Sequence, residues 1–204
     1  YVIFPQHAVD LKAQFKKILA TEYTAVSTPI QYAAIAGFEI SHEMDEYFKI
    51  TRNIHKIMGE YTYNRLTAID GIKATKPEAT FYLLADFNAY SPELQTAKIT
   101  TSQKLAETLI VHPYHTAIVG GDSLVLERTD FSARIAYVDY DGAKVYDAYQ
   151  KQLPKTHSER IEFVQNHAPK IVAGLTMLEK FFNELKKDAV DELMLIKNNI
   201  RIPN

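Results

Sequence analysis

The 204-residue chain contains no cysteine, which excludes disulfide bonds, a thiolate metal site and a cysteine nucleophile. This absence is compatible with a reducing compartment, and we expect a cytoplasmic protein. No apolar run approaches the roughly 20 residues that a membrane-spanning helix needs, and no signal peptide pattern is visible. With a formal net charge of -2, the chain has no basic excess that would favour nucleic acid or an acidic membrane surface.

Several kinds of catalytic site also lack their sequence signatures. The seven histidines show no HExxH or comparable ligand spacing, although His112 and His115 lie close together, so we expect no metal site. The turn Gly120-Gly121-Asp122 lacks the spacing of a glycine-rich phosphate loop. No serine lies in a nucleophile-elbow pattern, and no basic patch accompanies the aromatic residues as nucleic-acid binding would require. The residues alone therefore name no reaction.

What is present is a helix-rich pattern with enough apolar residues, 47% of the chain, to build a core. A 3.6-residue period and capping residues predict helices over 6–21, 26–36, 42–68, 103–111, 142–152 and 158–199. Strands are predicted over 72–75, 80–87, 116–119 and 133–138, with a loop over 88–92. This order predicts an α/β or α+β domain whose small sheet is covered by helices.

Two further features concern the N-terminal third of the chain. Tyr1-Val-Ile-Phe-Pro5 is typical of the end of a buried strand, so we expect the chain to be a fragment of a longer protein. The predicted helix over 42–68, capped by Ser41, would be roughly 40 Å long, a length suited to linking two domains.

Arg134 is the most suggestive side chain, because it lies in a predicted strand among small and apolar neighbours. A cation there needs an anionic partner if it is buried, and its planar fork suits a carboxylate held by two parallel hydrogen bonds. The alternative is an arginine on an edge strand that points into water. The strand alone does not decide between them.

Three stretches in order resemble the C-terminal part of the class I/II aminotransferases, fold-type I enzymes that use pyridoxal 5'-phosphate (PLP). Ser27-Thr-Pro-Ile-Gln-Tyr-Ala-Ala34 resembles the family segment S-x-P-x-Q-x-A. Lys76-Pro-Glu-Ala-Thr-Phe-Tyr-Leu-Leu-Ala-Asp-Phe87 resembles its small-domain strand, P-x-G-A-F-Y-L-F. Phe131-Ser-Ala-Arg-Ile-Ala136 resembles the strand with the carboxylate-binding arginine. The resemblance covers roughly residues 1–150.

The resemblance implies a division of the chain. Residues 1–41 would end the large cofactor-binding domain, residues 42–68 would form the connecting helix, and residues 69–153 would form the small C-terminal α/β domain. Residues 154–204 would be a helical C-terminal extension, which the resemblance does not explain. The full-length protein would be a homodimer that moves an amino group between an amino acid and a 2-oxo acid.

The resemblance also implies roles for individual residues. Arg134 would bind the α-carboxylate of the substrate. Ser27 or Thr28 would approach the cofactor phosphate across a dimer interface, with a helix cap as the equal alternative for these hydroxyls. Phe81 or Tyr82 would be core residues of the small domain.

Two departures from the family limit what is expected of this chain. Ala79 stands where the family has glycine, which would alter the turn before the strand. No lysine here lies in the family's cofactor-lysine motif, so we expect that lysine to precede Tyr1 and residues 1–204 alone to be inactive. Two alternatives stay open. One is a related PLP reaction, as in a decarboxylase, a β-lyase or an aminocyclopropane-carboxylate synthase. The other is a helical interaction module with no enzymatic activity.

Overall fold

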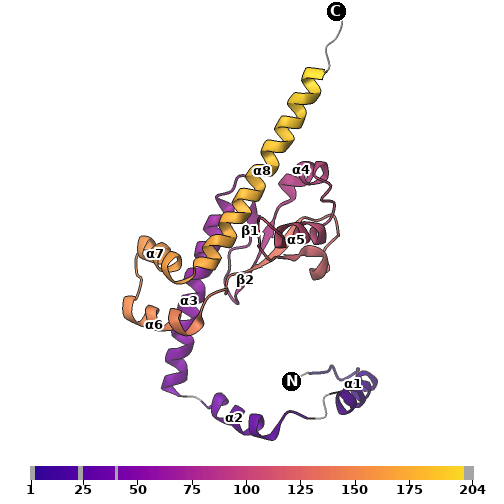
Figure 1. Ribbon diagram of the computed structural model, residues 1–204. Coiled ribbons are helices and arrows are strands. Elements are labelled where there is room, and N and C mark those ends of the chain that lie inside the picture. Colours follow the sequence, from indigo (N-terminus) through magenta and orange to yellow (C-terminus); the bar gives the residue numbers. More distant parts are fainter. Residues whose placement is uncertain (1–2, 23–24, 40, 200–204) are drawn as a thin grey trace, which may run out of the picture. The chain divides into compact units, whose positions relative to one another are not determined.

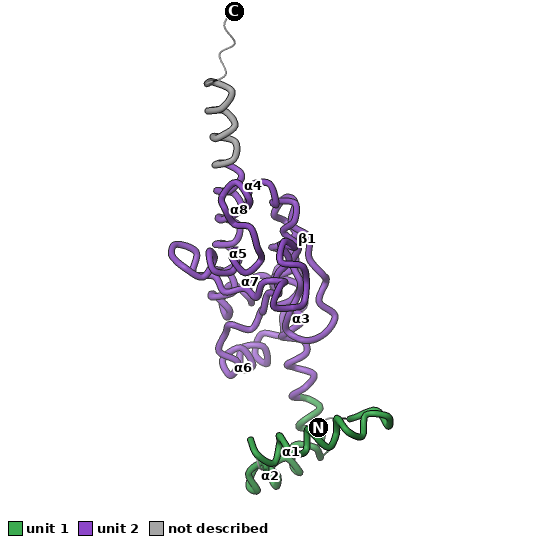
Figure 2. Tube along the Cα trace, turned by 90° about the vertical axis from the view of Figure 1, so that its right-hand side faces the viewer, with its two compact units in different colours: residues 1–46 green, residues 47–204 purple. Residues whose placement is uncertain are grey.

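The computed structural model describes residues 3–22, 25–39 and 41–199, with side chains in the last helix as far as Lys187 (Figure 1). The chain divides into two compact units, residues 1–46 and residues 47–204 (Figure 2). Helix α3 (His42–Thr67) begins in the first unit and continues into the second. As predicted, Ser41 caps it: the Ser41 hydroxyl accepts a hydrogen bond of 3.1 Å from the backbone N–H of Met44.

The first unit contains helices α1 (Val9–Glu22) and α2 (Thr28–Phe38), close to the predicted ranges, and neither helix has a buried residue. The strand predicted over residues 1–5 is wrong where it can be checked. Tyr1 and Val2 lie outside the described residues, and residues 3–5 form no strand. A strand needs a neighbour to accept its hydrogen bonds, and the described part of this unit supplies no other strand.

The second unit contains, among its described residues, one four-stranded antiparallel sheet in the order β1-β2-β4-β3. Its strands are β1 (Lys73–Ala74), β2 (Tyr82–Asp86), β3 (Val119–Gly120) and β4 (Ser132–Ala136). All four fall at or next to predicted strands, although β3 begins only at the last residue of its predicted range. The predicted loop over 88–92 is wrong, since a 3-10 helix η1 (Asn88–Tyr90) and helix α4 (Ser91–Thr96) occupy that segment.

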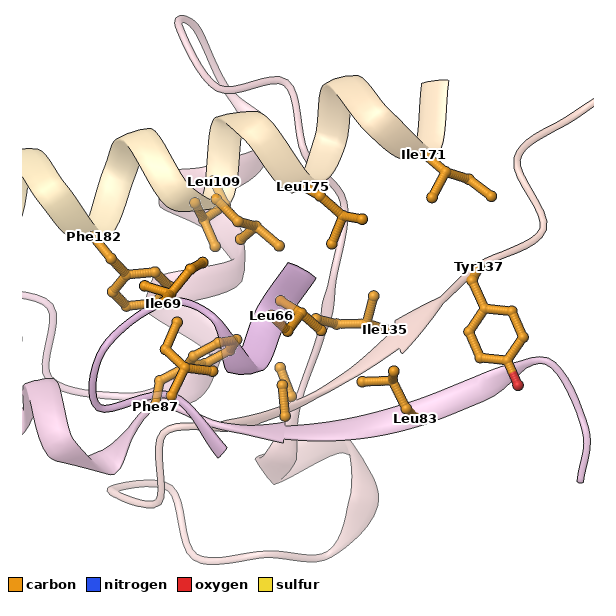
Figure 3. Packing of buried hydrophobic residues seen from close by; sticks show 14 of the residues in the cluster. Leu66, Ile69, Leu83, Phe87, Leu109, Ile135, Tyr137, Ile171, Leu175 and Phe182 are labelled. Carbon is orange, nitrogen blue, oxygen red and sulfur yellow. The ribbon is translucent and has the colours of Figure 1, made fainter. Parts of the chain in front are cut away.

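The hydrophobic core lies between one face of the sheet and helix α8 (Pro169–Asn199), as Figure 3 shows. Leu83 of β2 and Ile135 of β4 point towards α8, which contributes Leu175 and Phe182. Leu66, near the end of α3, lies among them and is fully buried. The period-2 alternation of β2 and β4 therefore places one side of each strand in the core and leaves the other side available.

The remaining helices cover the edges of this core. They are α5 (Ser102–Ile110), α6 (Gly142–Gln152), α7 (His157–His167) and the short 3-10 helix η2 (Gly121–Leu124). Arg65 of α3 forms an ion pair of 3.1 Å with Glu179 of α8, and Arg160 of α7 forms one of 3.2 Å with Glu60 of α3. The result is a mixed α/β unit of helices around a small antiparallel sheet, as predicted. None of the described helices combines the length and hydropathy needed to cross a membrane.

Candidate functional site

Arg134 lies on β4, an inner strand of the sheet. Its backbone is paired with Leu84 of β2 on one side and with Val119 of β3 on the other. The edge-strand alternative for this arginine is therefore wrong. The neighbours of Arg134 along β4, Ala133 and Ile135, are buried in the core, so alternation directs Arg134 to the opposite face.

The guanidinium group of Arg134 is partly buried, and no ion pair or hydrogen bond to it occurs within the described residues. Its Nε atom is buried without an acceptor, and its Cζ atom lies 4.3 Å from the centre of the Tyr82 ring. Asp86, a carboxylate two residues from Leu84 on β2, accepts hydrogen bonds of 2.8 Å from the backbone and side chain of Asn88 instead. The Arg134 guanidinium group thus packs on an aromatic ring and retains N–H groups that form no hydrogen bond within the described residues.

The prediction that Phe81 or Tyr82 is a core residue is wrong. The core side of β2 consists of Leu83 and Ala85. Tyr82 is partly buried and contacts Arg134, while Phe81 is 38% exposed and its ring centre lies 4.3 Å from that of Tyr82. The prediction failed because a strand's apolar content does not say which of its two sides faces the core.

A hydrogen-bond network fixes the start of the strand that carries Arg134. The Asn88 side chain donates to Asp130 Oδ1 at 2.9 Å and accepts from the Phe131 backbone at 3.0 Å. The Ser132 hydroxyl donates to the same Asp130 oxygen at 2.6 Å. The bonds from Ser132 and then Asn88 lower the pKa of Asp130 from its ordinary value. Sequence reasoning missed this network, whose members are separated by more than 40 residues.

A second polar cluster lies at the other end of the sheet. Tyr140 Oη and His55 Nδ1 are 3.3 Å apart, and the Tyr137 hydroxyl donates to the Thr80 carbonyl at 3.2 Å. Burial, and secondarily Tyr137, raises the pKa of Tyr140 to about 12, and burial lowers the pKa of His55. Both groups are therefore neutral at pH 7. An open groove of about 880 Å³, between α3 and the segment before β2, is lined in part by His55 and Tyr137.

Ser27 and Thr28 lie in the first unit, at the start of α2, and the structure does not place them relative to Arg134. Ser27 occupies the N-cap position, as the cap alternative predicts, but its side chain makes no capping hydrogen bond. Pro29 follows in the first turn, as predicted. The hydroxyls and the free backbone N–H groups of this helix start are donors suited to an anion.

Comparison with known proteins connects these features. The family model for aminotransferase class I and II matches residues 1–141, which include α2, β2 and the strand of Arg134. A search of curated proteins finds no match for the chain. The family match spans more than half of the sequence, and the chain belongs to the class I and II aminotransferases, a family of PLP-dependent fold-type I enzymes.

Proposed function

We propose that this protein is an aminotransferase that moves an amino group between an amino acid and a 2-oxo acid, with Arg134 binding the substrate α-carboxylate. The observation that carries the proposal is the state of Arg134. It is a partly buried cation on an inner strand, with an unpaired buried Nε and no acidic partner within the described residues. A charge in such a place is costly to desolvate unless an anion joins it.

The start of α2 fits the phosphate group of PLP in its donor chemistry. The Ser27 hydroxyl makes no capping hydrogen bond, and in the first turn only Thr28 and Ile30 have backbone N–H groups without a helical acceptor, since Pro29 has no N–H and Gln31 donates to the Ser27 carbonyl. We therefore propose Ser27 and Thr28 as residues that hold the phosphate. We assign no lysine of residues 1–204 to the cofactor.

When bound, PLP supplies an electron sink that stabilises negative charge developing at the substrate α-carbon. The residues of this chain would supply binding and orientation. Two terminal N–H groups of Arg134 match the two oxygens of a carboxylate, which fixes the substrate in direction as well as position. Because the arginine stands on a strand paired on both sides, its backbone moves little, and the Cα–H bond is held in one orientation for proton removal.

The first unit supports a homodimer as part of the same proposal. Helix α2 contains no charged residue, and Ile30, Tyr32, Ile35 and Phe38, on different sides of it, are each at least 57% exposed. A helix that is apolar all round is normally enclosed by protein. We propose that the cofactor-binding domain and a second subunit enclose it.

The division of the chain and its location follow the same proposal. Residues 1–41 would belong to the cofactor-binding domain, 42–68 to the connecting helix, 69–153 to the small domain and 154–204 to a helical extension. The extension packs into the core of the sheet-bearing unit through Phe163, Leu178 and Phe182, so it would stabilise the domain that carries Arg134. A cytoplasmic location fits the absence of cysteine.

Related reactions on the same cofactor would use Arg134 equally well, so the products decide between them. The full-length protein, saturated with PLP, is incubated with single amino acids and either 2-oxoglutarate or pyruvate. We expect equimolar formation of a new amino acid and a new 2-oxo acid, measured by chromatography. Release of carbon dioxide would replace the proposal by a decarboxylase, and release of ammonia by a lyase.

Substitution of Arg134 tests the residue assignment. In Arg134→Ala, we expect the kcat/KM for the best substrate to fall by an amount equivalent to about 2–5 kcal/mol, as for the loss of one partner of a buried charge pair. Arg134→Lys should recover only part of this loss, because a lysine keeps the charge without the fork. Arg52→Ala, an exposed arginine on α3, is the matched control. A near-normal kcat/KM in Arg134→Ala would remove this residue from the mechanism.

A further inference from the structure

The contact between Tyr82 and Arg134 has a geometry that bears on how the arginine works. The Arg134 Cζ atom lies over the Tyr82 ring at 4.3 Å from its centre. The two other cation–ring contacts found in the described residues are longer, 5.9 Å for Arg65 over Tyr61 and 5.0 Å for Lys186 over Tyr90. A contact that places a cation over an aromatic face within 6 Å is attractive, and more so where water is excluded.

The sheet register produces this contact. Tyr82 is paired with Ala136, two residues beyond Arg134 on β4, so the two side chains are diagonal neighbours on the same side of the sheet. Aromatic and long side chains reach each other across this diagonal. The ring is itself supported, because the Phe81 ring centre lies 4.3 Å from it and the His55 ring centre lies 6.3 Å from that of Phe81.

The ring is the part of Tyr82 that holds the arginine. No hydrogen bond of the Tyr82 hydroxyl occurs within the described residues, and the Arg134 Nε has no acceptor there either. A guanidinium group has two kinds of surface: a flat face, which packs on rings, and an edge of N–H groups, which binds carboxylates. Packing on Tyr82 occupies the face and leaves the edge for a ligand.

We propose that Tyr82 is a positioning residue for Arg134: its ring orients the guanidinium so that the free N–H edge receives the substrate carboxylate. This inference rests on the proposed function, because it requires that Arg134 bind a carboxylate. Without the ring, the side chain regains several rotamers and binding must select one of them, which lowers affinity without removing the charge.

The experiment compares carboxylate binding among variants of the full-length PLP-loaded protein. Binding of pyruvate and of 2-oxoglutarate is measured by isothermal titration calorimetry. In Tyr82→Leu we expect a loss of affinity of roughly 3- to 30-fold, the range of a partly desolvated cation–ring contact. Tyr82→Phe keeps the ring and should bind within about 2-fold of wild type. Tyr47→Leu, which removes a half-exposed tyrosine on α3, is the matched control.

A spectroscopic measurement separates positioning from general damage to the fold. The ring current of Tyr82 should shift the NMR signals of the Arg134 side chain upfield, because its Cζ lies above the ring. That shift should persist in Tyr82→Phe and disappear in Tyr82→Leu, while the thermal unfolding temperature of Tyr82→Leu reports whether the sheet remains folded. If Tyr82→Leu unfolds, Tyr82→His, which keeps a smaller aromatic face, replaces it and should show an intermediate loss.

The outcomes distinguish the two proposals. Wild-type affinity in Arg134→Ala, or no binding of either 2-oxo acid to the wild type, would overturn the proposed function and this inference with it. Loss of binding in Arg134→Ala together with wild-type affinity in a folded Tyr82→Leu would overturn the positioning role alone. Equal losses in Tyr82→Phe and Tyr82→Leu would overturn it too, since they would assign the effect to the hydroxyl.

Discussion

The two faces of the four-stranded sheet are built from alternate residues of the same strands, yet they have opposite chemistry. One face contributes Leu83 and Ile135 to a core that α8 closes. The other carries Arg134 on the Tyr82 ring. The apolar side chains of the first face are buried by the described chain. The second face carries a cation that has no anionic partner within the described residues. We infer that the core face determines stability and the other face is kept for binding.

The largest expected effect is on the free energy of unfolding, and it comes from removing a core side chain. Phe182 of α8 is fully buried and its ring lies 4.9 Å from that of Phe87 and 4.6 Å from that of Tyr90. Phe182→Ala should lower the free energy of unfolding by about 3–5 kcal/mol, because it removes a large apolar group and leaves a cavity. Urea unfolding followed by circular dichroism measures it.

Arg134→Ala supplies the contrast in the same unfolding measurement. It should change the free energy of unfolding by less than about 1 kcal/mol, because the group it removes forms no ion pair within the described residues. Phe48→Ala, a half-exposed phenylalanine on α3, is the control for removal of a ring and should cost less than half the Phe182 loss. Comparable losses of unfolding free energy in Phe182→Ala and Arg134→Ala would contradict the inference that only the core face determines stability.

The next effect concerns the network that joins β2 to β4. Asn88→Ala removes the bonds to Asp130, Asp86 and the Phe131 backbone. We expect a loss of about 1–3 kcal/mol in the free energy of unfolding, since it leaves partly buried groups without partners. Carboxylate affinity should fall as well, because this network holds the start of the Arg134 strand. Thr96→Ala, which removes a single exposed hydrogen bond on α4, is the control. Unchanged affinity would show that the strand register is secure without the network.

Some parts of this fold could be predicted from the sequence, and others could not. Periodicity and capping predicted α3, α6 and the strand of Arg134, because these signals are local. The side to which Tyr82 points, and the inner position of β4, depend on pairing with strands far along the chain. The strand that pairs with the outer side of β4 is only two residues long, and its predicted range, 116–119, does not indicate which strand it pairs with. The contact that holds Arg134 therefore became visible only in three dimensions.

A smaller effect concerns strain near the Arg134 strand. Val125, six residues before Phe131, has φ 66° and is 95% exposed, although a β-branched residue rarely adopts this backbone conformation. Val125→Gly should raise the free energy of unfolding by about 0.5–1 kcal/mol, because relief of the strain exceeds the entropy cost of glycine. Lys98→Gly, at φ 60° without β-branching, should change it less. A fall in carboxylate affinity in a stabilised Val125→Gly would show that the strained loop serves the binding face.

The smallest expected effect is a pH dependence at the ring stack that adjoins Tyr82. Burial lowers the pKa of His55 in the folded protein, so the unfolded chain takes up this proton first as the pH falls below about 6.5. The contribution of His55 to stability is therefore complete above that pH and is lost as the pH falls towards the folded-state value. His55→Gln has no such titration at this position. The difference in unfolding free energy between wild type and His55→Gln should thus shift in favour of the variant from pH 7.5 to pH 5.5. If this difference stays constant over the range, protonation of His55 does not destabilise the folded protein. The packing of Phe81 and Tyr82 beside it then does not require a neutral imidazole.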